Sequence, residues 1–285
     1  SRGMPRFIQA GRVNGRGPKI IGAGGGSSPP APTAPVIADA EYVLWLRGEE
    51  ADESQTITDS GYYSRVCTPT GATKNDTAQK YFGNSSLYFD GSNDYVTVAH
   101  NNVDFESTSS DTQTWQAWVR PSTVSGLDYL YGHYVDGNNR LTIQRNTTSY
   151  QASLTIGGVS QFILTATSAA ALDTWAHVRL TRDGSAWDLS IDGVSADTGT
   201  SSATLSGTAT IKVGTFQSVS GWLGFIDDFA FIDGTALTYD PTLELAGPTA
   251  INAAPVASSV TIELVGALVD SGVEVVDNAI PVINT

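Results

Sequence analysis

The side chains of one segment of this chain suit contact with a sugar or with a protein partner. Between residues 129 and 140, aromatic rings are interspersed with planar polar groups, a mixture that matches the apolar faces and hydroxyl groups of a glycan. The candidate ligand contacts in this segment, which we expect to form a loop, are Tyr129, Tyr131, His133, Tyr134, Asp136, Asn138 and Arg140. Tyrosines that alternate along a strand often only pack against a neighbouring face, so the pattern also fits a structural role.

Residue types that catalyse reactions are few and scattered. The three histidines, His100, His133 and His177, lie far apart in the sequence, and His177 falls within an expected strand. No serine or cysteine lies in the sequence of a nucleophile elbow. Cys67 is the only cysteine, so no intramolecular disulfide can form and the core alone must stabilise the fold. These observations predict a protein that is not an enzyme.

Basic residues are concentrated at the start of the chain. Residues 1–38 contain no Asp or Glu but include five cations, Arg2, Arg6, Arg12, Arg16 and Lys19. The rest of the chain holds 10 basic and 29 acidic side chains, a net charge of −19 within a total of −14. Because an acidic body binds nucleic acid poorly, we expect the basic segment to dock on acidic surfaces of other protein subunits.

The composition of residues 1–38 is that of an extended linker. Glycine and proline recur in it, as in GGGSSPPAPTAP at 24–35. Such a segment buries too little apolar surface to order by itself, so we expect an extended arm held by contacts with neighbouring subunits. No apolar run approaches the roughly 20 residues that span a bilayer, and the first residues lack the apolar segment of a secretory signal. We therefore expect no membrane partner.

The chain from residue 39 onward reads as a succession of short strands. Apolar and polar residues alternate in short segments that Asp-Gly and Gly-Gly pairs separate, which is typical of hairpins in sandwiches and jelly rolls. These segments are 87–89, 95–98, 115–119, 141–143, 154–156, 176–180 and 187–191. A short helix is conceivable only at 169–174. We predict an all-β protein, with an antiparallel β-sandwich over 39–246 and a short β extension over 247–285.

Five segments, in order along the chain, resemble laminin-G-like jelly rolls of the concanavalin A-like type. The segment YFGNSSLYFDGSNDYV at 81–96 is similar to the family's fGxxsLxFdGxxDyv sequence, and TWQAWVRP at 114–121 is similar to its fTxsaWvkP strand. The others are 42–50 with 57–61, 175–184 with 189–193, and 221–229 with 235–238. The resemblance implies a jelly roll. The tryptophans lie in or beside the expected strands, where large aromatic rings fill the space between two sheets, so we expect most of them to pack in the core and Trp115, Trp118 and Trp175 to be largely buried.

The resemblance also raises a catalytic pattern and a metal site. The resemblance implies that glycoside hydrolases of this fold carry a strand with the sequence Glu-x-Asp-x-x-Glu, which points its acidic side chains into one groove. Here Glu50 and Asp52 match the first two acids, but Gln55 takes the place of the second Glu, and the segment falls in an expected loop. Hydrolysis is therefore not expected. Carried over by motif, a structural Ca²⁺ would be held by Glu50, the carbonyl of Gly91 and Asp227, oxygen ligands of the kind this ion prefers.

Two classes of function remain open. The first is a structural or display protein of a larger assembly, such as a phage capsid-decoration or tail-fibre protein made in the host cytoplasm. Its arm would contact other subunits and its jelly roll a surface glycan. The second is a carbohydrate-binding module or adhesin of a bacterial surface protein, extracellular or on the cell surface, with the arm as a plain linker. The basic arm, the disulfide-free fold and the acidic body favour the first.

Overall fold

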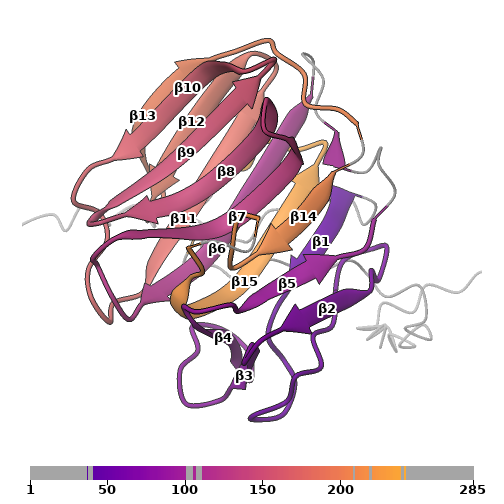
Figure 1. The fold of residues 1–285 in the computed structure, drawn as a ribbon, viewed down its shortest axis with the longest axis vertical. Coiled ribbons are helices and arrows are strands. Elements are labelled where there is room, and N and C mark those ends of the chain that lie inside the picture. The colour runs from indigo at the N-terminus through magenta and orange to yellow at the C-terminus, as the bar shows by residue number, and fades with distance from the viewer. Residues whose placement is uncertain are drawn as a thin grey trace, which may run out of the picture.

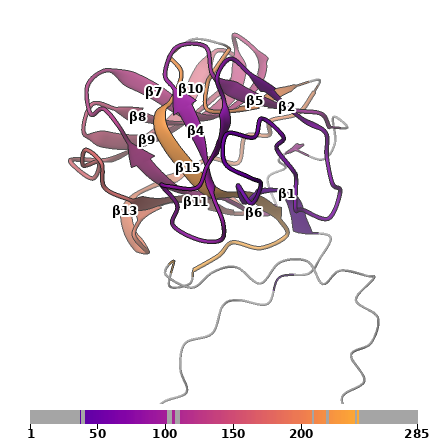
Figure 2. The same cartoon turned by 90° about the horizontal axis from the view of Figure 1, so that it is seen from below.

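The computed structural model describes residues 37, 41–100, 105–106, 111–207, 209–217, 220–238 and 241. They form two antiparallel β-sheets packed face to face, which Figure 1 shows from one side and Figure 2 from below. The predicted antiparallel β-sandwich is confirmed. No α-helix occurs in this part of the chain, so the short helix considered at 169–174 is wrong, and turns and irregular backbone occupy that segment.

The first sheet has eight strands. In spatial order seven of them are β13 (Val194–Thr200), β12 (Ala186–Ile191), β11 (Ala176–Asp183), β6 (Thr112–Pro121), β15 (Leu223–Asp233), β4 (Ser86–Asp90) and β3 (Lys74–Asp76). The eighth, β1 (Tyr42–Leu46), pairs with the C-terminal half of β15. A β-bulge in β15 between Asp227 and Ala230 separates the half that pairs with β4 from the half that pairs with β1.

The second sheet has seven strands. In spatial order they are β10 (Val159–Ala166), β9 (Ser149–Ile156), β8 (Asn139–Asn146), β7 (Leu127–Asp136), β14 (Thr210–Val213), β5 (Tyr95–Val98) and β2 (Cys67–Thr70). Strands β7 to β10 follow one another as hairpins and lie side by side in Figure 1. One continuous segment of the chain, from β7 to β10, therefore forms more than half of this sheet. Strand β14 follows β7 by about 80 residues in the sequence but pairs with it in the sheet.

Tight turns explain why the predicted strands end where they do. Gly157 (φ 58°) and Gly158 (φ 77°) connect β9 to β10, and Asp192 (φ 50°) and Gly193 (φ 78°) connect β12 to β13. Two-residue hairpins with positive φ at both central positions match the right-handed twist of the flanking strands, and glycine and aspartate tolerate that backbone best. These pairs are the turn signals expected from the sequence.

Aromatic side chains fill the space between the sheets. The ring of Trp115 stacks on Trp187 at 5.9 Å and on Phe231 at 4.9 Å between centroids, and all three residues are fully or almost fully buried. They belong to the large apolar cluster between the sheets. Stacked rings contribute buried area and a further 0.5–1.5 kcal/mol or so per pair. The expectation for Trp115 is thus confirmed.

Trp118 is buried as predicted, but neither Trp118 nor Trp175 belongs to the cluster between the sheets. Trp118 is buried but is absent from the inter-sheet cluster, because strand alternation points it to the opposite face of β6 from Trp115. There it stacks on Tyr81, with 3.4 Å between ring centroids. Trp175 precedes β11, contacts Tyr81 edge-on and stays partly exposed.

A second, smaller apolar cluster joins the two ends of the described chain. It consists of Ile37, Tyr42, Trp45, Ala230, Ile232 and Leu237. The five cations of the predicted arm, Arg2, Arg6, Arg12, Arg16 and Lys19, lie outside the described residues, and so does the predicted extension 247–285. Within the described part of the chain there is no helix of the length and apolarity that crossing a membrane requires.

Candidate ligand-binding surface

The segment expected to be a ligand-binding loop is strand β7, and its alternation divides the predicted contacts between two faces. A β-bulge between Tyr129 and Tyr131 turns both Leu130 and Tyr131 into the core. His133 also points inward and is buried, whereas Tyr129 and Tyr134 remain partly exposed on the outer face of the second sheet. The loop assignment is therefore wrong, and only part of the predicted set can face a ligand.

Tyr131 and His133 are core residues. The ring of Tyr131 stacks on Phe229 of the opposite sheet at 5.6 Å, and burial raises the pKa of the phenol. Burial also lowers the pKa of His133 to about 3, so its ring is neutral at physiological pH. With relative exposures of 0% and 2%, neither side chain can contact a ligand bound to the outer face.

Asp136 and Asn138 lie at the tip of the β7–β8 hairpin. The Asp136 carboxylate accepts hydrogen bonds from the backbone N–H of Asn138 at 2.7 Å and from Nδ2 of Asn139 at 3.0 Å. These bonds lower the pKa of Asp136 and hold the turn. Both residues are exposed, but their observed contacts serve the hairpin. Tyr129, Tyr134 and Arg140 are the predicted contacts that the structure brings together on the sheet face.

The Phe216 ring contacts both of these tyrosines. Its ring centroid is 5.1 Å from that of Tyr129 and 5.5 Å from that of Tyr134. This approach depends on Gly132, because a Cβ added there would lie 3.1 Å from Cδ2 of Phe216 and 3.1 Å from the Thr215 carbonyl oxygen. The missing side chain at Gly132 allows the segment after β14 to pack closely on the sheet, where Phe216 is 9% exposed.

A hollow of about 240 Å³ opens next to Phe216. We call it the Gly132 hollow, and its lining residues are Gly132, Tyr134, Thr210, Lys212 and Gln217. At about 30 Å³ per water molecule, its volume corresponds to roughly eight waters, which is the scale of a single sugar ring. An aromatic ring, a hydroxyl, an amide and an ammonium therefore face one small space, the combination of apolar and hydrogen-bonding groups expected of a ligand site.

Polar side chains continue from the Gly132 hollow across the outer face of the second sheet. Thr142 on β8 is paired with Gly132 and is hydrogen-bonded to Ser153 on β9 at 2.8 Å. In the next row Gln144 donates to Gln151 at 3.0 Å, and Gln151 donates to Thr165 of β10 at 3.4 Å. At about 4.8 Å between strands, this polar track extends roughly 14 Å from β7 to β10.

The residues that complete the hollow were missed in the sequence. The lining residues Thr210, Lys212 and Gln217 come from β14 and the segment after it, far along the chain from the tyrosines of β7. The signal for β14 is only the short alternation TIKV at 210–213, within a stretch rich in Gly, Ser, Thr and Ala. Nothing local in the sequence indicates that this strand lies between β5 and β7.

Two of the three calcium ligands implied by the resemblance, Gly91 and Asp227, lie apart along β15. The Glu50 carboxylate accepts hydrogen bonds from two backbone amides of its own loop, and Asp227 accepts two from the 81–82 backbone, at 2.6 and 2.9 Å. Gly91 packs against Leu223, four residues before Asp227 on β15, a separation of roughly 13 Å along a strand. Among the described residues no group of three or more His, Cys, Asp or Glu side chains is placed to hold a metal. The three predicted ligands therefore do not form one site.

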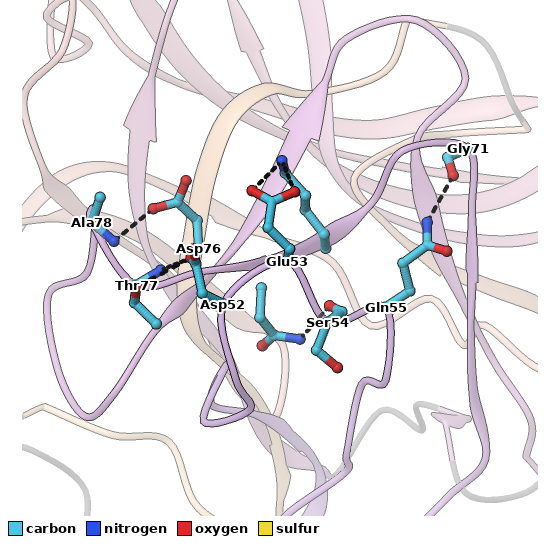
Figure 3. Close-up of polar contacts among 10 residues, drawn as sticks. Asp52, Glu53, Ser54, Gln55, Gly71, Asp76, Thr77 and Ala78 are labelled. Carbon is cyan, nitrogen blue, oxygen red and sulfur yellow. Dashed lines mark hydrogen bonds and ion pairs between the residues drawn. The ribbon is translucent and has the colours of Figure 1, made fainter.

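The acidic segment 50–55 holds loops together rather than lining a groove (Figure 3). Asp52 accepts hydrogen bonds from the backbone N–H of Thr77 at 2.9 Å and from its hydroxyl at 3.1 Å. Glu53 forms an ion pair with Lys74 at 2.6 Å. The segment lies in the connection between β1 and β2, so the period-2 spacing of a strand does not align its carboxylates.

Comparisons with known proteins agree with the observed architecture. A family model described as the concanavalin A-like lectin/glucanases superfamily matches residues 90–240. No curated protein matches the chain in sequence. Among solved structures, the receptor binding domain of botulinum neurotoxin D has a TM-score of 0.55 at 13% identity, over 70% of this chain and 50% of that one.

Two further structures are similar to this one. Domain 4 of AbnA, a GH43 extracellular arabinanase from Geobacillus stearothermophilus, in complex with arabinotriose, has a TM-score of 0.52 at 15% identity, over 70% of this chain and 96% of that one. The binding domain of Paraclostridial Mosquitocidal Protein 1 has a TM-score of 0.55 at 14% identity, over 69% and 49%. The chain spans about half the length of the two toxin domains.

Proposed function

Because the chain belongs to the concanavalin A-like lectin/glucanases superfamily, we propose that its sandwich is a binding domain that takes a glycan on the outer face of the second sheet. The observation on which this rests is the position of Phe216 over Gly132 and beside Tyr134, next to the Gly132 hollow. Aromatic rings cover the apolar face of a sugar, while hydroxyl, amide and ammonium groups bond its hydroxyls. All three kinds of polar group line this hollow.

The similar structures support a binding role. One is an arabinanase domain in complex with arabinotriose, and two are receptor-binding or binding domains of toxins. In this chain the carboxylates of the acidic segment 50–55 serve loop contacts. We therefore propose that the domain binds glycans without hydrolysing them.

Truncation of Tyr134 is expected to abolish most of the glycan affinity. Screening the full chain on a glycan array identifies a ligand, and calorimetric titration then compares the wild type with Tyr134→Ala. Tyr134 would be a central aromatic contact, and removing such a contact from an interface costs about 2 kcal/mol or more, so we expect roughly a 30-fold rise in Kd. Release of reducing ends, followed in the same samples, is expected to stay at the background level.

The matched control is Tyr62→Ala. Tyr62 is 45% exposed and lies in the β1–β2 connection, where its backbone N–H donates to the Tyr42 carbonyl. This variant removes an exposed ring of the same type and is expected to retain wild-type affinity. Glycan binding that survives Tyr134→Ala, or sustained hydrolysis of the bound glycan, would contradict the proposal.

We further propose that residues 1–38 attach the binding domain to a larger assembly, most specifically to other subunits of a phage virion. The supporting observation is the separation of charge, with five cations and no acid on residues 1–38 and a net charge of −19 on the rest. A basic segment attached to an acidic body is attracted to acidic protein surfaces. The alternative is an adhesin or carbohydrate-binding module on a bacterial surface, in which residues 1–38 only link two domains.

Deletion of residues 1–25 is expected to leave the sandwich folded but to prevent its incorporation into particles. Co-sedimentation with particles measures incorporation, and circular dichroism measures folding. A second variant, with glutamine in place of Arg2, Arg6, Arg12, Arg16 and Lys19, keeps the length of the segment and is also expected to dissociate, because the attraction is electrostatic and screened over about 8 Å at physiological salt. Full incorporation of both variants would favour the adhesin alternative.

A further inference from the structure

Four partly exposed side chains with polar groups form one row across the outer face of the second sheet. They are strand partners in turn from β7 to β10, namely Tyr129, Gln144, Gln151 and Thr165. Because residues that pair directly on neighbouring strands point to the same face, these side chains stand in a line perpendicular to the strands. The four strands that carry the row lie side by side in Figure 1. This row is the longer part of the polar track described above.

Hydrogen bonds fix the orientation of the two amides in this row. Gln144 donates through Nε2 to Oε1 of Gln151 at 3.0 Å, and Gln151 donates through Nε2 to the Thr165 hydroxyl at 3.4 Å. The amide oxygen of Gln144 in turn accepts from the hydroxyl of Thr142 at 3.3 Å. An amide nitrogen carries two N–H groups, so each glutamine keeps a second N–H that bonds to none of the described residues. The row is therefore held in place and still offers donors to the oxygen atoms of a ligand.

The row itself carries no charge. Its four side chains are neutral at physiological pH, since burial raises the pKa of the Tyr129 phenol above its ordinary value. At the β10 end the carboxylate of Asp197 on β13 accepts from the backbone N–H of Thr165 at 2.8 Å. A charged group on a ligand would lose water without meeting a counter-charge in the row, so the row favours a neutral ligand.

We infer, on the basis of the glycan-binding function proposed above, that the ligand is a linear, neutral oligosaccharide of about three residues that crosses the strands from the Gly132 hollow toward β10. The hollow of about 240 Å³ suits one sugar ring, which is then roughly 6 Å across. The polar track spans roughly 14 Å, so about two further rings fit along it. Gln144 and Gln151 would donate to the oxygen atoms of these two rings.

A length series of linear oligosaccharides tests this inference. The series contains one to six residues of the neutral glycan that the glycan array identifies, and NMR titration of the full chain measures each Kd. Because each ring on the track gains about one net hydrogen bond, we expect the Kd to fall roughly fivefold with each residue up to the trisaccharide. Beyond three residues the Kd is expected to stay nearly constant, because the track ends at β10.

Substitution of the two amides separates the track from the hollow. The double variant Gln144→Ala with Gln151→Ala is expected to abolish the dependence on length, so the Kd of the trisaccharide should rise roughly 25-fold. Circular dichroism checks that the variant is folded. The matched control is Gln55→Ala, which removes an exposed amide in the β1–β2 connection that donates to the Gly71 carbonyl. This control should reproduce the wild-type length series.

The possible outcomes distinguish this inference from the proposed function. A Kd that does not fall beyond the single sugar, with binding still lost in Tyr134→Ala, overturns the inference and leaves glycan binding at the hollow intact. A length dependence that persists in the folded double variant also overturns it, as does an array on which only charged glycans bind. Glycan binding that does not depend on Tyr134, or an array that binds no glycan, overturns the proposed function and the inference with it.

Discussion

Replacing Asp128 with alanine is expected to lower the free energy of unfolding by about 3–5 kcal/mol. Asp128 on β7 and Arg145 on β8 are strand partners, and their side chains are 12% and 0% exposed. The Arg145 guanidinium donates to the Asp128 carboxylate and, at 2.7 Å, to the Thr147 carbonyl. Without Asp128 a buried cation loses its counter-charge, and folded domains have only about 5–15 kcal/mol of stability in total.

Two further variants give this prediction its controls. Glu53→Ala breaks the ion pair with Lys74, whose side chains are 65% and 26% exposed, and it is expected to cost less than about 1 kcal/mol. The double variant Asp128→Ala with Arg145→Met replaces the buried pair with apolar groups and is expected to recover most of the loss. Chemical denaturation measures all of them. A loss below about 1 kcal/mol in Asp128→Ala would show that water can replace the carboxylate.

The stability of the sandwich is expected to fall as the pH is lowered from about 6 to 4.5, and two substitutions should change this slope in opposite directions. Burial lowers the pKa of His133 and of His177 to about 3, from an ordinary value of 6.5. In this range the unfolded chain therefore holds nearly two protons that the folded chain does not. Each such proton costs about 1.4 kcal/mol of stability per pH unit.

Asp227 acts in the opposite sense. Burial raises its pKa to about 7, so in this range the folded chain holds a proton that the unfolded chain has lost. This carboxyl stabilises the fold at low pH, and its contribution is lost as the pH rises through 7. Of these three groups, two favour unfolding in acid and one opposes it, so they leave a net slope of one proton.

Denaturation midpoints between pH 4.5 and 6 distinguish the variants. Asp227→Asn removes the opposing group, so its loss of stability in acid should steepen by about 1.4 kcal/mol per pH unit. His133→Gln should flatten the loss by the same amount. The other titrating groups are common to all three proteins and cancel in the differences. Parallel pH profiles for the wild type and Asp227→Asn would show that the carboxyl has an ordinary pKa.

The strands of the sandwich were predictable because local chemistry defines them. Alternation at 95–98 coincides with β5, and the glycine turn at 157–158 joins β9 to β10 as expected. The laminin-G-like motifs also indicated the jelly-roll fold. The inward turn of Tyr131 was not predictable, because a β-bulge beside Leu130 shifts the alternation of β7.

The candidate site was predictable only in part, for a physical reason. Tyr129, Tyr134 and Arg140 lie on one hairpin, and their spacing in the sequence indicates that they are neighbours. Lys212 and Phe216 reach them only through the pairing of β14 with β7, a contact between distant parts of the chain. Which strand lies beside which in a sandwich depends on the packing of the whole core, and no short sequence pattern reports it.

The pairing of β1 with β15 determines how the domain would respond to a pulling force. Tyr42, at the start of β1, pairs with Ile232, near the end of β15. Tension applied through the two flanking segments would therefore act at the same end of this antiparallel pair. Its hydrogen bonds lie perpendicular to the strands and would open one after another, as in a zipper, instead of being sheared together. A domain pulled between its two flanking segments would thus yield first at its chain ends, with the sheet that bears the Gly132 hollow still folded.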